Sequence, residues 1–435
     1  MSPHSYTSPL AQELSAGVLE RFLRYARIDT QSRIDRTRSP STPGQLELAR
    51  LLAAECRQAG LDDAALDQHG YVTATLPAGD GAQLPVIGLI AHMDTSPEAP
   101  GAGVAPIVHR DYRGGVIALE WGGTRLDPAA MPELAAKVGH DLVTASGDTL
   151  LGADDKAGVA AIMTAIAHLA ANPQLPRPPL RIAFTPDEEI GEGATLFDIG
   201  RFGARYAYTI DGSELGELQD ETFSAAEVTI TIHGVDVHPG QATGKLVSAL
   251  RLAARIVAAL PADTLAPETT RGREGFIHPT RLTGTPAKAC IRAIVRDFDD
   301  ELLAAHVALL EQTARAVLDA EPRARISIEV REQYRNMRRH LDRVPEVVAA
   351  AEQAMREEGI APLRDPIRGG TDGSRLSEMG LPTANIFTGG HEYHSVREWV
   401  SVQDMAAAAA TIVRLAGVWA QPQTLPGAGD VGAAR

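Results

Sequence analysis

Three apolar runs in the first half of the chain predict strands that are buried on both faces, because a fully buried strand lacks polar alternation. They are PVIGLIAHMD (85–94), LRIAFTP (180–186) and YAYTIDG (206–212). Between the first two lies DDKAGVAAIMTAIAHLAAN (154–172), which starts with acids and ends at Asn-Pro, as helices often do. Strands of this kind that alternate with helices predict an α/β domain with a mostly parallel sheet.

The pattern changes after residue 212. The segment AEVTITIHG (226–234) alternates with period two, which predicts a strand with one buried face. From there to residue 333 the patterns predict the order β-α-β-β-α-β, which is typical of a small α+β domain. The α/β pattern then resumes, so the smaller domain is inserted into the larger one. We expect the α/β domain at 1–218 and 337–420, the inserted domain at 219–336 and a disordered tail at 421–435.

Composition narrows the possible partners. A chain of 435 residues is long enough for two domains. Its net charge of -15 argues against a nucleic-acid or anionic-membrane partner. The two cysteines, Cys56 and Cys290, form no disulfide framework and suit the reducing cytoplasm. The start of the chain lacks the basic and apolar regions of a secretory signal, so we expect a cytoplasmic protein.

Side chains that can bind metal follow the predicted strands where each strand leaves the core. In open α/β sheets, binding sites form outside the carboxyl ends of the strands, so these side chains should converge. They are His92 and Asp94, Glu188 and Glu189, Asp211, and His391 and His394, together with Asp154 and Asp155 at the start of the predicted helix.

A cluster of several carboxylates requires a compensating cation, because like charges cannot all stay ionised at close range. Imidazole nitrogens and carboxylate oxygens without thiolates suit Zn²⁺, with Mn²⁺ or Co²⁺ as competitors. Five or more ligands exceed what one catalytic ion uses. Two ions that share a carboxylate, at a separation of roughly 3.5–4 Å, fit the number of ligands better.

Each motif also has an ordinary structural explanation. DDK can cap a helix, DEE can form a solvated turn and TIDG can be a plain turn. For no site to exist, all of these explanations would have to hold together at the strand ends of one sheet. A common binding site explains the motifs more simply. The glycine-rich GQATGK (240–245) departs from the Walker A spacing, and no G-x-S-x-G elbow or cysteine nucleophile motif is found.

With these residues, the chain resembles the M20 family of co-catalytic zinc peptidases, and within it the tripeptide aminopeptidases. The resemblance runs from ERFLRYARIDTQS (20–32) to NIFTGGHEYHSVREWV (385–400) and includes ten specific stretches. The resemblance implies a mostly parallel zinc-peptidase catalytic domain with an inserted domain of the lid or dimerisation type. The stretches are HMDTSP, LLGADDKAGVA, TPDEEIG, TIDG, VDVHPG, REGFIHP, RDFD, RNM, PIRGGTDGS and NIFTGG, in the order that the family has them.

The resemblance also implies a role for individual residues. The implied metal ligands are His92 and Asp211 for one ion, Glu189 and His394 for the other, and Asp154 as the bridging carboxylate, with a cis peptide bond to Asp155. The implied catalytic residues are Glu188 as general base, Asp94 as the acid that orients His92, and His238, which stabilises the oxyanion and comes from the partner subunit in dimeric members. The implied substrate-binding residues are Arg296, Asn336 and Arg368.

The implied reaction is hydrolysis of the first peptide bond of a tripeptide by a water molecule that bridges two Zn²⁺ ions. The expected partners are small peptides and a second copy of the chain, which binds through the inserted domain. Two alternatives stay open. One is another M20-type amidohydrolase, such as a dipeptidase or an N-acyl amino acid deacylase. The other is a catalytically silent binding protein with the same fold.

Overall fold

The computed structural model describes residues 6–79 and 84–421 and divides into two compact units. The first unit contains Met1–Asp220, Arg339–Asp365 and Thr371–Arg435, and the second contains Glu221–Arg338 and Pro366–Gly370. The division predicted from the sequence lies two residues before each of the two main boundaries, but it assigns 366–370 to the first unit. Apart from residue 421, the predicted tail lies outside the described residues.

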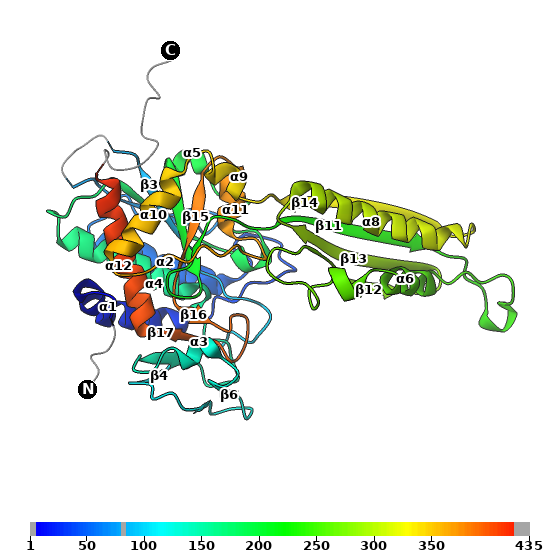
Figure 1. The fold of residues 1–435 in the computed structure, drawn as a ribbon, viewed down its shortest axis with the longest axis horizontal. Coiled ribbons are helices and arrows are strands. Elements are labelled where there is room, and N and C mark those ends of the chain that lie inside the picture. Colours follow the sequence, from blue (N-terminus) through cyan, green and yellow to red (C-terminus); the bar gives the residue numbers. More distant parts are fainter. Residues whose placement is uncertain (1–5, 80–83, 422–435) are drawn as a thin grey trace, which may run out of the picture. The chain divides into compact units, whose positions relative to one another are not determined.

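The first unit is built on a seven-stranded sheet with the strand order β1-β2-β8-β3-β9-β15-β10 (Figure 1). Its four central strands, β8, β3, β9 and β15, run parallel, and the outer strands pair antiparallel. This confirms the predicted α/β class with a mainly parallel sheet. The strands are β1 (Ala65–Leu66), β2 (Val72–Leu76), β3 (Ile87–His92), β8 (Leu180–Thr185), β9 (Tyr206–Gly212), β10 (Leu218–Gln219) and β15 (Thr383–Phe387).

Helices cover this sheet. All six residues of β3 and all five of β15 are buried, as their apolar runs predict. Helix α4 packs on β3 and β9, and α1 and α12 pack on α4 (Figure 1). Helix α4 is apolar around most of its circumference because it is enclosed in this way. The helices are α1 (Pro9–Ala26), α2 (Pro43–Gln58), α4 (Ala153–Ala171), α5 (Ile199–Phe202), α10 (Glu346–Glu357), α11 (Asp372–Glu378) and α12 (Val402–Trp419).

None of the helices that the structure describes is both long enough and apolar enough to span a bilayer.

Two small sheets in the first unit were not predicted. They have the orders β16-β17-β7-β4 and β5-β6, and their strands contain only two or three residues. Such short strands show no periodicity in the sequence. They enclose an apolar cluster that includes Leu142 and Trp399. The strands are β4 (Ile107–His109), β5 (Ile117–Ala118), β6 (Arg125–Leu126), β7 (Leu142–Thr144), β16 (Gly390–His391) and β17 (Trp399–Ser401), and the helix α3 (Pro132–Ala135) accompanies them.

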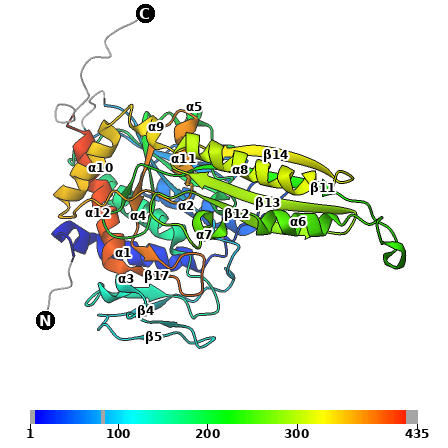
Figure 2. The same ribbon diagram turned by 45° about the vertical axis from the view of Figure 1, so that its right-hand side comes forward.

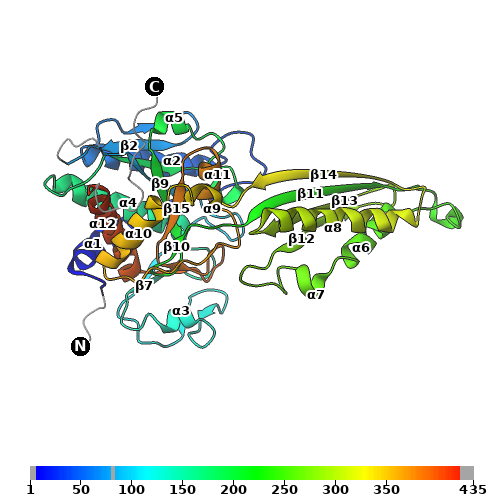
Figure 3. The same ribbon diagram turned by 45° about the horizontal axis from the view of Figure 1, so that its top comes forward.

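The second unit is a four-stranded antiparallel sheet of order β12-β13-β11-β14, on which α6 and α8 pack (Figure 2, Figure 3). Val228, Ile230 and Ile232 alternate along β11 and form one apolar face with the two helices. The element order is the predicted one. The elements are β11 (Ser224–His233), α6 (Ala249–Ala258), α7 (Ala262–Leu265), β12 (Phe276–Gly284), β13 (Lys288–Asp297), α8 (Asp300–Asp319) and β14 (Arg325–Tyr334), followed by α9 (Arg338–Leu341).

Candidate metal centre

The five predicted metal ligands lie together at the carboxyl ends of the parallel strands of the first unit. His92 is the last residue of β3, and Asp211 lies near the end of β9. Glu189 lies in the short 3₁₀ helix η1 (Glu188–Ile190), which follows β8. Asp154 is the second residue of α4, and His394 lies in the loop between β16 and β17. Because β3, β8 and β9 are parallel neighbours, their carboxyl ends meet at one edge of the sheet.

The distances divide these side chains into two groups that share Asp154. The Nε2 atom of His92 lies 2.8 Å from Oδ1 of Asp154 and 3.6 Å from Oδ1 of Asp211. The Nε2 atom of His394 lies 3.3 Å from Oδ2 of Asp154 and 2.9 Å from Oε2 of Glu189. Each oxygen of Asp154 therefore faces a different histidine, which is the arrangement expected of a carboxylate that bridges two ions.

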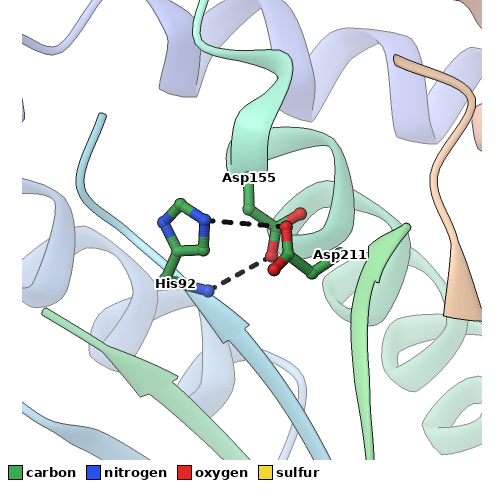
Figure 4. A group of neighbouring side chains, drawn as sticks. All are labelled: His92, Asp155 and Asp211. Carbon is green, nitrogen blue, oxygen red and sulfur yellow. Dashed lines mark hydrogen bonds and ion pairs between the residues drawn. The ribbon is translucent and has the colours of Figure 1, made fainter. Parts of the chain in front are cut away.

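Asp155 is the other candidate for the shared ligand, since it forms a possible metal group with His92 and Asp211 (Figure 4). Both oxygens of its carboxylate already accept main-chain hydrogen bonds. Oδ2 accepts from the N–H of His92 at 3.2 Å, and Oδ1 accepts from the N–H of Gly158 at 3.1 Å. The peptide bond between Asp154 and Asp155 is cis, as the family resemblance implies. These contacts favour Asp154 as the shared ligand.

Two further observations show that these side chains are suited to bind metal ions. Oε1 of Glu189 is buried and has no hydrogen-bond partner among the described residues. Burial and the charge of Asp154 raise the pKa of Glu189 to about 8, and the same two causes raise the pKa of Asp211 to about 6. Bound divalent ions would remove this mutual repulsion and supply a partner for the free oxygen.

In the absence of a metal ion, the protonated rings of His92 and His394 compensate part of the negative charge of the carboxylates. Hydrogen bonds to Asp154 and Glu189 raise the pKa of His394 to about 11. Burial opposes protonation of His92, but its hydrogen bonds to Asp154 and Asp211 raise its pKa well above the usual value. For Asp154, burial is likewise outweighed by hydrogen bonds from His394 and His92, which hold its pKa below the usual range. Metal binding would displace protons from both rings, because only a neutral imidazole coordinates.

Asp94 contacts His92 and also the two glutamates that follow β8. Nδ1 of His92 lies 3.0 Å from the main-chain oxygen of Asp94 and 3.5 Å from its carboxylate. The carboxylate accepts the main-chain N–H groups of Glu188 at 2.9 Å and Glu189 at 3.2 Å. Asp94 therefore contacts the His92 ring through both its carbonyl group and its carboxylate, and the carboxylate also holds Glu188 and Glu189.

Glu188, the predicted general base, begins η1 beside the ligand Glu189. Burial is the main cause that raises the pKa of Glu188 well above its usual value, and the negative charge of Asp372 adds to it. Asp372 is itself buried and accepts a hydrogen bond from Oγ1 of Thr185 at 2.9 Å. A raised pKa suits a group that takes up a proton at neutral pH.

Sequence reasoning missed two acids next to the centre. Asp372 stands in the stretch PIRGGTDGS, which carries part of the family resemblance but gave no role to this aspartate. Oε2 of Glu98 lies 3.3 Å from Nδ1 of His394, the usual place of a carboxylate that orients a metal-bound histidine. The only signal for Glu98 in the sequence is its position shortly after His92 and Asp94.

The other predicted residues lie in the second unit. His238 is exposed, and its Nδ1 accepts the N–H of Gly240 at 3.2 Å, so a neutral ring carries its hydrogen on Nε2. Arg368 donates to the main-chain oxygens of Gly272 at 2.9 Å and Glu274 at 2.7 Å. The catalytic and substrate-binding roles of these residues stay predictions.

Arg296 and Asn336 have different surroundings in that unit. Nη1 of Arg296 lies 3.4 Å from the main-chain oxygen of Arg368, and its Nε is buried without a partner among the described residues. Asn336 is buried and donates to the main-chain oxygen of Phe298 at 3.1 Å and to Glu221 at 3.3 Å. Asn336 is thus bound to its own unit, whereas Nε of Arg296 is a buried donor without an acceptor among the described residues.

Asp187, the first of the three adjacent acids, has a structural contact. It adopts a left-handed conformation with φ 60°, and its side chain is buried. The carboxylate accepts the N–H of Ser41 at 2.8 Å and the amide of the buried Gln45 at 2.8 Å. It therefore ties the turn after β8 to the start of α2.

Replacing Asp187 with Ala should lower the free energy of unfolding by about 1–3 kcal/mol, because it leaves the partly buried N–H of Ser41 without an acceptor. The amide of Gln45 would keep only its longer contacts, at 3.2 Å, to the hydroxyl groups of Ser41 and Thr42. Denaturant unfolding of the variant checks this value. Asp62→Ala, which removes an exposed carboxylate, serves as the control and should leave the stability unchanged. Equal stability of the two variants would contradict the structural role of Asp187.

Comparisons with known proteins identify the family of the chain. The model of the peptidase family M20/M25/M40 matches residues 149–417. The peptidase T of Geobacillus kaustophilus is 47% identical over 405 residues, which cover 93% of this chain and 98% of the relative. The peptidase T of Vibrio parahaemolyticus is 46% identical over 404 residues, with the same coverage.

Solved structures show the same fold. The aminopeptidase PepT of Bacillus cereus superposes with a TM-score of 0.73 at 24% identity, over 94% of this chain and 99% of that one. The YXEP protein of Bacillus subtilis, described as a dinuclear metal binding peptidase from the M20 family, gives a TM-score of 0.65 at 15% identity, over 94% and 98%. These findings confirm the resemblance seen in the sequence. The chain belongs to the M20 peptidase family.

Proposed function

We propose that the chain is a metal-dependent aminopeptidase that releases the N-terminal residue of tripeptides. The observation that carries this proposal is the pair of histidine–carboxylate groups that share Asp154, with Glu188 beside them. The names of the relatives point to the same activity. Two Zn²⁺ ions suit the donor set best, and Mn²⁺ or Co²⁺ are possible substitutes.

Bound ions would supply a water molecule of lowered pKa and a polarised scissile carbonyl group. Glu188 accepts the proton of the attacking water and later donates it to the leaving amine. The hydrogen bonds from the N–H groups of Glu188 and Glu189 to Asp94 hold the base and the ligand in their different orientations. His238 carries an Nε2–H donor that suits a developing oxyanion.

The remaining assignments extend this proposal. Arg296, Asn336 and Arg368 would hold the peptide, with the guanidinium groups as donors for its carboxylate. A second copy of the chain would bind through the second unit. We expect the enzyme to act in the cytoplasm, where free cysteines such as Cys56 and Cys290 stay reduced.

Hydrolysis of a tripeptide should require both a bound metal and a free N-terminus. We expect a metal chelator to abolish the activity and Zn²⁺, Mn²⁺ or Co²⁺ to restore it. An N-acetylated form of the same tripeptide should stay intact. The release of the N-terminal amino acid, measured by chromatography, checks both results.

Dipeptides and N-acyl amino acids complete the substrate panel. Preferred cleavage of either class over the tripeptide would support the alternative amidohydrolase. Equal cleavage of the free and the acetylated tripeptide would rule out an aminopeptidase. Protein that binds no metal when it is prepared without a chelator would point to the silent binding protein.

A further inference from the structure

Glu398 is a buried carboxylate outside the set of predicted ligands. It directly precedes β17, and only 1% of its surface is exposed. Its Oε2 accepts the N–H groups of Leu151 and Gly152, both at 2.7 Å, and its Oε1 accepts the N–H of Asp154 at 3.0 Å. One side chain therefore satisfies three main-chain donors of the segment that leads into α4.

This segment has no regular structure that could hold it in place. Gly152 adopts φ 80°, and a Cβ atom there would lie 3.1 Å from Cγ2 of Thr95. The backbone angles of Asp154 are not helical, although the helix is counted from Ala153. The carboxylate of Asp154 is attached to this irregular backbone, so its position depends on the contacts that fix the backbone.

Glu398 is itself held firmly. Its N–H donates to the main-chain oxygen of Ser395, the residue that follows His394. The next residue, Trp399, is fully buried, pairs with β7 and stacks on His391 at a ring distance of 4.2 Å. The loop that carries His394 therefore also carries the acid that fixes Asp154.

We propose that Glu398 is a positioning residue that sets the place of Asp154 between His92 and His394 and thereby the affinity of the centre for two ions. The inference rests on the proposed function, because it takes Asp154 as the shared ligand. Glu398 itself contacts neither the substrate nor the ions.

The substitution Glu398→Gln tests this role. Glutamine keeps the shape of the side chain but replaces one acceptor with an NH₂ group, so at least one of the three N–H donors must face another donor. Loss of such an outer contact weakens metal binding by about 10–100-fold. Titration of the metal-free protein with Co²⁺, followed by visible absorption, should show this weakening for at least one ion.

A matched control is Glu358→Gln. Glu358 is equally buried, and its carboxylate binds Thr7, Ser8 and Arg414 rather than a segment with a predicted ligand. The control should bind two ions with the affinity of the wild type. If Glu398→Gln is folded and also binds both ions with wild-type affinity, the inference is wrong.

A second measurement needs no variant. In the metal-free wild type, the amides of Leu151, Gly152 and Asp154 should exchange slowly with deuterium, because Glu398 already holds them. Fast exchange that slows only when metal is added would overturn the inference, since the ions would then organise the segment. A wild type that binds no ions or cleaves no tripeptide would instead contradict the proposed function, so the two failures can be told apart.

Discussion

Replacing Glu188 with Gln should lower kcat for a tripeptide by about 10²–10⁴-fold, the usual contribution of a general base, while both ions stay bound. Glutamine has the size of glutamate but cannot take up a proton at neutral pH. The main-chain N–H of residue 188 still donates to Asp94, so η1 keeps its place. The neighbouring ligand Glu189 is unchanged.

The experiment measures kcat, KM and the metal content of the same preparation. Glu192→Gln is a suitable control, because Glu192 follows η1 on the same loop and its carboxylate pairs with Arg36 at 2.7 Å. It should retain the wild-type kcat. A Glu188 variant with wild-type turnover would exclude this residue as the base, and a variant without metal would show that it acts as a ligand.

The main elements of the fold could be predicted because each has a strong periodic pattern. The runs that became β3, β8 and β9 are mostly apolar and almost entirely buried, since helices cover both faces of the sheet around them. The strands β16 and β17 could not be predicted, because two or three residues contain no period. Their positions depend instead on the packing of Trp399 and its neighbours, which is a tertiary effect.

The chemistry of the site was visible in the sequence, but the geometry was not. Polar residues at the ends of buried strands indicated where His92, Glu189 and Asp211 would meet. The choice between Asp154 and Asp155 followed from the family resemblance. The structure adds two physical reasons: each oxygen of Asp154 faces a different histidine, and both oxygens of Asp155 already accept main-chain hydrogen bonds. Glu398 lies far from α4 in the sequence, so its contact with this segment becomes visible only in the folded chain.

The largest effect on metal binding should come from replacing Asp154 with Ala. His92 and Asp211 would remain for one ion, and Glu189 and His394 for the other. Two protein ligands for each ion are fewer than the three that catalytic zinc sites use. We therefore expect the variant to lose both ions on gel filtration and to lose all activity towards tripeptides.

Asp211→Ala provides the comparison, because it removes a ligand from one group only. The group of Asp154, Glu189 and His394 stays complete, so this variant should retain one ion per chain. The metal-to-protein ratio, measured by atomic spectroscopy, separates the two results. Retention of both ions by Asp154→Ala, together with their loss in Asp155→Ala, would assign the shared position to Asp155. Since the carboxylate of Asp155 already accepts the N–H groups of His92 and Gly158, it would have to give up these bonds to bind an ion.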